Sequence, residues 1–275
     1  MTDQVILAID GGAPSAAAEH WVVARSRHFP AEIEVTSVLE HAPLATGYPD
    51  VERDRRRRRL DATADRLRAV IPDATVRTKL RHGDIVEELI AASTSAAVLV
   101  VGMTRVDAFE ELAHMTLGLR LAGRTHGVLV VVPTGWAAGV GRVVVGWDTD
   151  AAGEAAVAFA AREARHAASA LTIVHAGSGA TPRELELSAE RLHAAGLAAG
   201  IHPVPEDAHA ATAILEAARD ADLIVIGSHG RNALEDLLVG SVSEHVLART
   251  QIPVAVVPVP AEPIAVSPDI PDEEL

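Results

Sequence analysis

Residues Gln4–Asp10 read QVILAID, and residues Arg142–Asp148 read RVVVGWD. Each stretch is an apolar run that ends in aspartate, and each is followed by an alanine-rich segment with helical spacing. A buried strand that leads directly into a helix is typical of the start of a βαβ unit. The two stretches therefore predict that such a unit begins twice along the chain.

The similarity between the two parts of the chain continues downstream. Ala97–Gly102 resembles Asp222–Gly227, and Gly127–Pro133 resembles Ile252–Pro258. Because three strand-like runs recur in the same order, the sequence predicts a tandem duplication. The glycine-rich segment Thr134–Gly141 marks the junction between the copies.

We therefore expect two domains and a tail, at residues 1–137, 138–260 and 261–275. The tail is rich in proline and carries five acidic residues and no basic ones. Such a segment buries too little apolar surface to fold, so we expect it to be disordered.

Strand-like and helix-like periods alternate within each half. Continuous Val, Ile and Leu runs indicate strands that are buried on both faces, and repeated βαβ units favour parallel sheets with right-handed crossovers. The expected fold class is α/β, with two tandem doubly wound five-stranded parallel-sheet domains. First-half strands are expected near residues 4–9, 32–38, 75–81, 97–102 and 128–132. Second-half strands are expected at Arg142–Trp147, Leu171–His175, Ile201–Val204, Leu223–Gly227 and Val254–Val257, with helices at Ala151–Ala168, Pro182–Ala199, Ala210–Asp220 and Glu235–Arg249.

Composition excludes several classes of protein. The 275 residues include no cysteine, which excludes disulfides, thiolate metal sites and a cysteine nucleophile. Lys79 is the only lysine and no Gly–Lys pair occurs, so the chain is not a P-loop NTPase. The net charge of −14 argues against nucleic acid and anionic membranes as partners. Because the chain has neither a membrane-length apolar run nor a signal-peptide start, we expect a cytoplasmic protein.

The segment that says most about function is Asp222–Leu247, which reads DLIVIGSHGRNALEDLLVGSVSEHVL. Gly227 and Gly230 follow a buried strand and lack a Cβ atom, so their backbone can approach a ligand closely. Ser241 and Ser243 begin a helix, where unpaired N–H groups and the helix dipole favour phosphate oxygens. Two segments rich in N–H groups that converge beyond a strand end predict a polyphosphate site.

The spacing G-x2-G-x9-G-[ST], met by Gly227, Gly230, Gly240 and Ser241, resembles the ATP-binding signature of the universal stress protein family. Nearly the whole chain resembles a tandem member of the actinobacterial type. The resemblance implies an adenine nucleotide alpha hydrolase-like fold with flavodoxin-like layering.

The resemblance also implies which residues contact the nucleotide. Asp148, which follows Gly146 closely, matches the family's aspartate near the ribose and adenine, and Val174 matches a residue that meets adenine through its backbone. Arg231 is the only nearby cation and would screen the phosphates. The expected binding residues are Gly146, Asp148, Val174, Gly227, Gly230, Arg231, Gly240, Ser241, Val242 and Ser243, and the expected ligand is ATP, with Mg²⁺ accompanying its phosphates.

The first half departs from this pattern, although Asp10 ends its first strand as the family expects. Arg105 stands where the second glycine belongs, and Leu119 stands where the hydroxyl belongs. From Gly102 to Gly118 is 16 positions, against 13 between the matching glycines of the second half. We therefore interpret the first half as carrying a degenerate nucleotide motif.

Structural roles are open for several of the same residues. Gly227 and Gly230 are also compatible with simple turns after a strand, and Asp148 or Ser243 with the capping of a helix. His229 is expected in an exposed loop. The 13 histidines are scattered without metal-ligand spacing, so we expect no dedicated metal site.

The arginine run Arg53–Arg59 resembles a nucleic-acid patch. It lies in Asp50–Val70, a helical stretch in which acidic residues stand at neighbouring helical positions. We interpret the run as an ion-paired, solvated helix face.

The resemblance implies a regulatory ATP-binding protein in the stress response, in which nucleotide occupancy alters conformation or partner binding. Fast catalysis is not expected, because the sequence offers no lysine cradle and no arranged nucleophile–base pair. The alternatives are a nucleotide-independent dimeric scaffold, a slow ATPase, and a nucleotidyl-transfer enzyme of the ATP-pyrophosphatase kind, whose SGGxDS loop is absent. The expected partners are an adenine nucleotide, a second copy of the chain and an unidentified protein.

The final strand of each half is short, apolar and rich in valine. Val128–Val132 and Val254–Val257 each end a domain's sheet, and an uncovered edge of this kind invites association. We therefore expect the two halves to pack as a pseudo-twofold pair through these strands.

Overall fold

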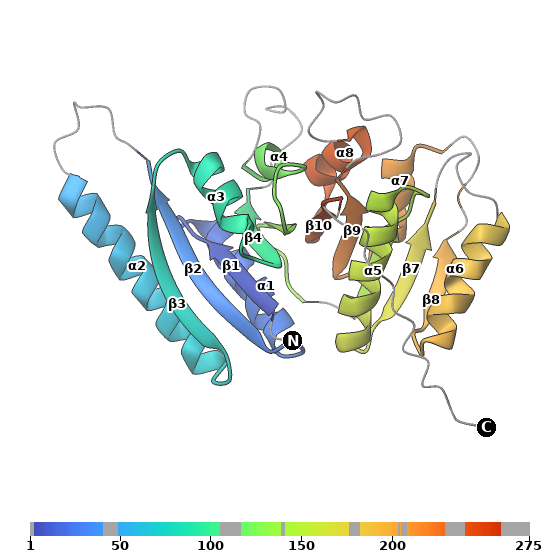
Figure 1. The fold of residues 1–275 in the computed structure, drawn as a ribbon, viewed down its shortest axis with the longest axis horizontal. Coiled ribbons are helices and arrows are strands. Elements are labelled where there is room, and N and C mark those ends of the chain that lie inside the picture. Colours follow the sequence, from blue (N-terminus) through green and yellow to red (C-terminus); the bar gives the residue numbers. More distant parts are fainter. Residues whose placement is uncertain are drawn as a thin grey trace.

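The computed structural model describes residues 3–40, 49–104, 117–138, 141–175, 182–202, 204, 208–228 and 240–259. Strands and helices alternate through both halves, as the alternating periods predict (Figure 1). The described strands are β1 (Asp3–Ala8), β2 (Ala31–Leu39), β3 (Thr75–His82), β4 (Val98–Met103), β5 (Val128–Pro133), β6 (Arg142–Gly146), β7 (Ala170–Val174), β8 (Ala199–His202), β9 (Leu223–Gly227) and β10 (Val254–Val257). The described helices are α1 (Ala13–Ser26), α2 (Pro49–Val70), α3 (Ile85–Ser93), α4 (Leu117–Leu121), α5 (Ala151–His166), α6 (Pro182–Ala194), α7 (Ala210–Ala217) and α8 (Ser241–Arg249).

The strands form one ten-stranded sheet in the order β3-β2-β1-β4-β5-β10-β9-β6-β7-β8. Within each half all five strands are parallel, and the second half repeats the strand order of the first in mirror sequence. The two halves meet where β5 and β10 pair antiparallel, with Val130 opposite Ala255. The predicted association through the final strands is confirmed, and it joins the two expected sheets into one.

The sheet is covered on both faces by helices, which explains its continuous apolar strands. Successive residues of a strand point to opposite faces, so Val98 and Val100 pack on one side and Leu99 and Val101 on the other. Helices α1, α2, α5 and α6 cover the first face. Helices α3, α4, α7 and α8 cover the second. Each core layer runs through both halves.

The helix predicted at Pro182–Ala199 is too long. Helix α6 ends at Ala194, and Gly196 follows with a φ of +77°, a left-handed conformation that commonly ends helices at glycine. The chain then turns back, so that β8 begins at Ala199, two residues before the predicted strand. The prediction overran because the alanines after the helix keep an apolar pattern.

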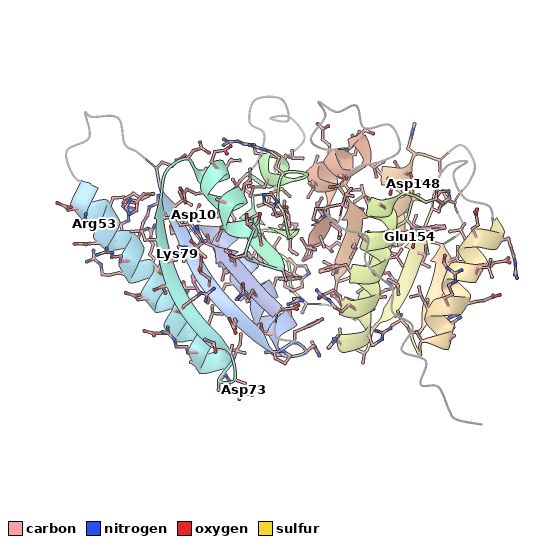
Figure 2. The ribbon with its side chains drawn as sticks, in the orientation of Figure 1. Asp10, Arg53, Asp73, Lys79, Asp148 and Glu154 are labelled. Carbon is pink, nitrogen blue, oxygen red and sulfur yellow. The ribbon has the colours of Figure 1, made fainter. Side chains whose placement is uncertain are left out.

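The arginine run on α2 is ion-paired, as the sequence predicts, but it is not wholly a solvated face, because Arg56 and Arg59 also donate to backbone carbonyls near the strand ends. Arg53 pairs with Asp50, and both Arg55 and Arg56 pair with Glu52, at spacings of three or four residues. Figure 2 shows Arg53 on this outer helix, at the end of the molecule formed by the first half.

Candidate functional site

The carboxyl ends of β6 and β9 form the centre of the candidate site in the second half. From β6 the sheet runs to β7 and β8 on one side and to β9 and β10 on the other, so the strand order reverses between β6 and β9. Ligands of open parallel sheets bind beyond the strand ends at such a reversal. Gly146 ends β6, Gly227 ends β9, and Asp148 follows two residues after Gly146 (Figure 2).

Helix α8 begins directly beside the end of β9. The N–H of Ser228 donates to the carbonyl of Val257 at 2.8 Å, and the N–H of Gly240 donates to the carbonyl of Ser228 at 3.4 Å. Gly240 is the N-cap residue of α8, and the first helical hydrogen bond runs from the N–H of Glu244 to the carbonyl of Gly240. The N–H groups of residues 241–243 precede that bond, so they have no acceptor within the helix.

Ser243 ties this helix start to the strand. Its side chain is buried, and its hydroxyl donates to the carbonyl of Gly227 at 3.0 Å. It is therefore not a helix cap, and α8 has no side-chain cap. Val242 packs partly buried against the core, whereas Ser241 is exposed. That these three residues contact a ligand stays a prediction. Val242 would make its contact through the backbone N–H.

Gly227 has a packing role that does not depend on a ligand. A Cβ atom at this position would lie 2.9 Å from the Cβ of Ala152, in the first turn of α5. At Gly102, the corresponding position of the first half, a Cβ atom would lie 2.0 Å from the carbonyl oxygen of Pro14 in α1. The close approach of helix to strand therefore accounts for both glycines. Gly146 likewise leaves room for Ile214, because a Cβ atom added at Gly146 would lie 2.7 Å from the Cδ1 atom of Ile214.

The cap of α5 is Asp150 and not Asp148. The carboxylate of Asp150 accepts a hydrogen bond from the N–H of Gly153 at 2.7 Å. The carboxylate of Asp148 is half-buried and accepts from the N–H of Thr149 at 2.8 Å. The capping interpretation of Asp148 is therefore wrong, and its contact with a ligand remains a prediction.

Val174 ends β7 with its side chain buried, so only its backbone would reach a ligand. Its carbonyl accepts from the N–H of Trp147 at 2.9 Å. An aromatic pair at this strand end was not predicted from the sequence. His175 Nδ1 lies 2.9 Å from the carbonyl oxygen of Trp147, and the two rings meet edge to face with centroids 5.7 Å apart. The signal was present in the sequence, because a tryptophan directly follows the β6 strand in a chain with few aromatic residues.

Asp10 occupies the position of Asp148 in the first half, with different contacts. One carboxylate oxygen accepts from the hydroxyl of Ser15 at 2.6 Å and from the N–H of Gly12 at 2.7 Å. Burial alone would raise the pKa of this carboxyl, but the hydrogen bonds from Ser15 and Gly12 and the charge of Arg56 lower the pKa below its ordinary value. Asp10 therefore stays ionised and holds the turn before α1.

Two arginines of α2 lie over the strand ends of the first half. Arg59 donates to the carbonyl of Asp10 at 2.8 Å. Its side chain also packs closely on Gly11, where an added Cβ atom would lie 2.9 Å from the Arg59 side chain. Arg56 donates to the carbonyl of Val38 at 2.8 Å and to the hydroxyl of Ser37 at 3.1 Å. The backbone carbonyls at the ends of β1 and β2 thus have partners from within the chain.

Several predicted residues lie outside the described part of the chain. These are Arg105, His229, Gly230 and Arg231, the first residues of the helix expected at Glu235–Arg249, and the tail 261–275. Leu119, which stands where the motif requires a hydroxyl, is among the described residues. It is partly buried and packs against the core.

The described residues also bear on metals and membranes. No cluster of three or more His, Cys, Asp or Glu residues that would hold a metal ion occurs among them. Within the same residues, none of the helices is both long enough and apolar enough to cross a membrane.

Comparison with known proteins identifies relatives of the whole chain. The model described as "Universal stress protein family" matches residues 1–133 and 176–258. A universal stress protein of Mycobacterium tuberculosis strain H37Rv is 31% identical, over 92% of this chain and 96% of its own length. A universal stress protein of Mycolicibacterium smegmatis is 28% identical, also over 92% of this chain and 96% of its own length.

Solved structures support the same fold. A universal stress protein from Archaeoglobus fulgidus matches with a TM-score of 0.78 at 21% identity, covering 94% of this chain and 96% of its own. A universal stress protein from Pseudomonas aeruginosa matches with a TM-score of 0.63 at 14% identity, covering 94% of both chains. These matches span both halves, so the fold of the two halves together is shared.

Proposed function

The chain belongs to the universal stress protein family, and from this premise we propose that it is a regulatory protein that binds ATP at the strand ends of its second half. Its role would be in the stress response, where nucleotide occupancy changes its conformation or its contacts with a protein partner. The observation that carries the proposal is the fixed start of α8 beside β9.

That helix start suits a phosphate for two reasons. The N–H groups of residues 241–243 precede the first helical hydrogen bond, and the positive end of the helix dipole lies at the same place. The bond from Ser243 to the carbonyl of Gly227 holds these groups against the strand end. A preorganised set of donors loses little conformational entropy when an anion binds.

The remaining groups would complete the site around the nucleotide. Asp148 follows β6, the strand beside β9, and Val174 ends β7, the next strand along the sheet. Both would lie on the nucleoside side, where Asp148 would accept hydrogen bonds from ribose hydroxyls. Arg231 would screen the phosphates, and Mg²⁺ would accompany them as it does in solution. ATP bound there would supply a polyanion whose presence or absence changes the local charge.

The second half offers little for fast phosphoryl transfer. Such a reaction needs several fixed charges around the γ-phosphate, and Arg231 is the one cation of the motif. We therefore expect hydrolysis far below the typical enzyme rate of about 10 per second. A homodimer would use a surface other than the β5 and β10 edges, because those strands pair with each other.

Native mass spectrometry of the gently purified full chain tests the proposal. The expected result is a species heavier than the chain by the mass of one adenine nucleotide, which added ATP restores after dialysis. A chain that stays unliganded at millimolar ATP would favour the nucleotide-independent scaffold. A turnover above about 1 per second would favour an ATPase instead.

A further inference from the structure

The seam between the halves is built around a pseudo-twofold axis, which strand register locates. Val5 and Val143 hold matching positions in the opening repeats, and they pair with Val98 and Leu223 respectively. When the register is followed to the next strand, Val130 of β5 is the counterpart of Ala255 of β10. These two counterparts also face each other across the seam. A residue that faces its own counterpart lies on the axis of a twofold interface.

A second self-facing contact lies on the same face of the sheet, between α1 and α5. Arg25 stands 15 residues after Asp10, and Glu163 stands 15 residues after Asp148, so they too are counterparts. Nε and Nη2 of Arg25 donate to the two carboxylate oxygens of Glu163, at 2.9 Å and 2.8 Å. The side chains are only 4% and 6% exposed.

Neighbouring groups complete this buried cluster. Nη2 of Arg25 also donates to Asp3 at 2.6 Å, and the Phe29 ring lies 4.0 Å from the guanidinium carbon. Arg162 is 39% exposed and lies 3.4 Å from Asp3 and 3.6 Å from Glu163. Burial opposes the charge of Arg25, but the carboxylates of Glu163 and Asp3 raise its pKa, so the guanidinium stays charged.

The opposite charges distinguish this interface from a true homodimer. Pairing two first halves from different copies would bring two Arg25 guanidinium groups together at the axis. Pairing two second halves would bring two Glu163 carboxylates together. Asp3 and Arg162 would accompany their own halves, but Asp3 engages only Nη2 of Arg25, and Arg162 makes no bidentate contact with Glu163. Each arrangement of like halves would therefore bury a like-charge contact in place of a bidentate ion pair, which is strongly unfavourable.

We propose that Arg25 and Glu163 determine which surfaces pair. The surface of a first half, with Arg25 at the axis, accepts only the surface of a second half, with Glu163 at the axis. The partner that fits is the second half of the same chain, held close by the short linker. Like-charge repulsion at the axis excludes assemblies in which copies of the chain pair like half with like half.

Two charge reversals test the proposal in the full chain. In Arg25→Glu both halves carry an acidic residue at the axis, and in Glu163→Arg both halves carry a basic one. Neither variant alone therefore forms a favourable pair. Expressed together with different tags, each chain's first half matches the other's second half. The expected result is a mixed-tag dimer, at least tenfold more abundant than for two tagged wild-type chains. Arg66→Glu breaks an exposed ion pair with Glu19 away from the seam, so it should behave as wild type.

An apolar variant tests the same point if the reversed chains fail to fold. Arg25→Met combined with Glu163→Leu removes both charges and keeps the volume, a change that stability usually tolerates. When differently tagged copies are refolded together, this variant should give at least tenfold more mixed-tag species than wild type. If neither the reversed pair nor the apolar variant exceeds the wild-type level, the linker alone determines pairing and the proposal is wrong.

Discussion

The strand ends of the two halves are made by the same elements but are occupied differently. In the first half, Arg56 and Arg59 extend from α2 to the ends of β1 and β2 and donate to backbone carbonyls. In the second half, the helix that corresponds to α2 is α6. Its apolar residues repeat the spacing of those on α2, with Leu185, Ala189 and Leu192 in the places of Leu60, Ala64 and Leu67.

That match places Glu184 where the first half has Arg59. One half thus directs a basic residue to its strand ends, and the other has an acidic residue at the same helical position. The glycines that permit helix packing, Gly102 and Gly227, are kept in both halves. The duplicated halves therefore share the glycines that the fold requires and differ in the side chains placed near their strand ends.

The seam should respond equally to a charge introduced from either half. Val130 and Ala255 are both 0% exposed and face each other, so Val130→Asp and Ala255→Asp each bury an unpaired carboxylate. We expect each to lower the free energy of unfolding by about 4 kcal/mol or more, measured by urea denaturation. Val51→Asp, at a residue that is 58% exposed, should change it by less than about 0.5 kcal/mol. Wild-type stability in Val130→Asp would contradict the described seam.

The two packing glycines should differ in how badly they tolerate a methyl group. In Gly102→Ala the new Cβ meets a backbone carbonyl oxygen at 2.0 Å, whereas in Gly227→Ala it meets a methyl group at 2.9 Å. Overpacking costs about 1–3 kcal/mol, and we expect the first variant near the upper end and the second near the lower. Urea denaturation of both variants measures the order, and a larger loss in Gly227→Ala would contradict the geometry.

The strand-end aspartate of the first half, Asp10, provides a test by pH. The folded pKa of Asp10 is lowered, so its ionisation stabilises the fold above the unfolded pKa of about 3.9, and that stability is lost as pH falls through the lower folded pKa. Asp10→Asn should therefore lose up to about 1 kcal/mol at pH 7 and show a shallower decline below pH 4. Asp54→Asn, at an exposed position on α2, is the control for the substitution and should change the free energy of unfolding at pH 7 by less than about 0.5 kcal/mol.

The arginine contact at the first-half strand end should contribute least to stability. Arg59 is half-buried and donates to the carbonyl of Asp10, so Arg59→Ala should cost about 0.5–1 kcal/mol by thermal or urea denaturation. Arg58→Ala, at the exposed neighbouring position, should be neutral. If both variants unfolded like wild type, Arg59 would not be fixed over the strand end.

The sequence was sufficient to predict the order of the strands, the duplication and the β5–β10 seam, because each depends on apolar runs that repeat in order, although β8 begins two residues before its predicted start. It was not sufficient for the details that depend on side-chain direction. Asp148 and Asp150 both precede α5, and only the hydrogen bond from the N–H of Gly153 to its carboxylate shows that Asp150 is the cap. The reach of Arg59 to Asp10 joins residues 49 positions apart, which no local pattern indicates.

The buried ion pair of the seam was missed for a similar reason. Arg25 and Glu163 look like ordinary charged residues near helix ends, and they meet only once the two halves have paired. Comparing the repeats position by position would have shown opposite charges at one site, but not that the site is buried. For Gly227 the sequence offered only a turn as the structural alternative, and its packing against Ala152 of α5 was not predicted.

Calorimetric titration of the full chain with ATP shows whether the second half alone binds the nucleotide, as we propose. We expect one ATP per chain, and in Gly230→Val we expect the affinity to be at least tenfold weaker, which is about 1.4 kcal/mol. Arg105→Val changes the corresponding position of the first half and should leave both affinity and stoichiometry unchanged. Two equal sites per chain, or an unchanged affinity in Gly230→Val, would contradict the account.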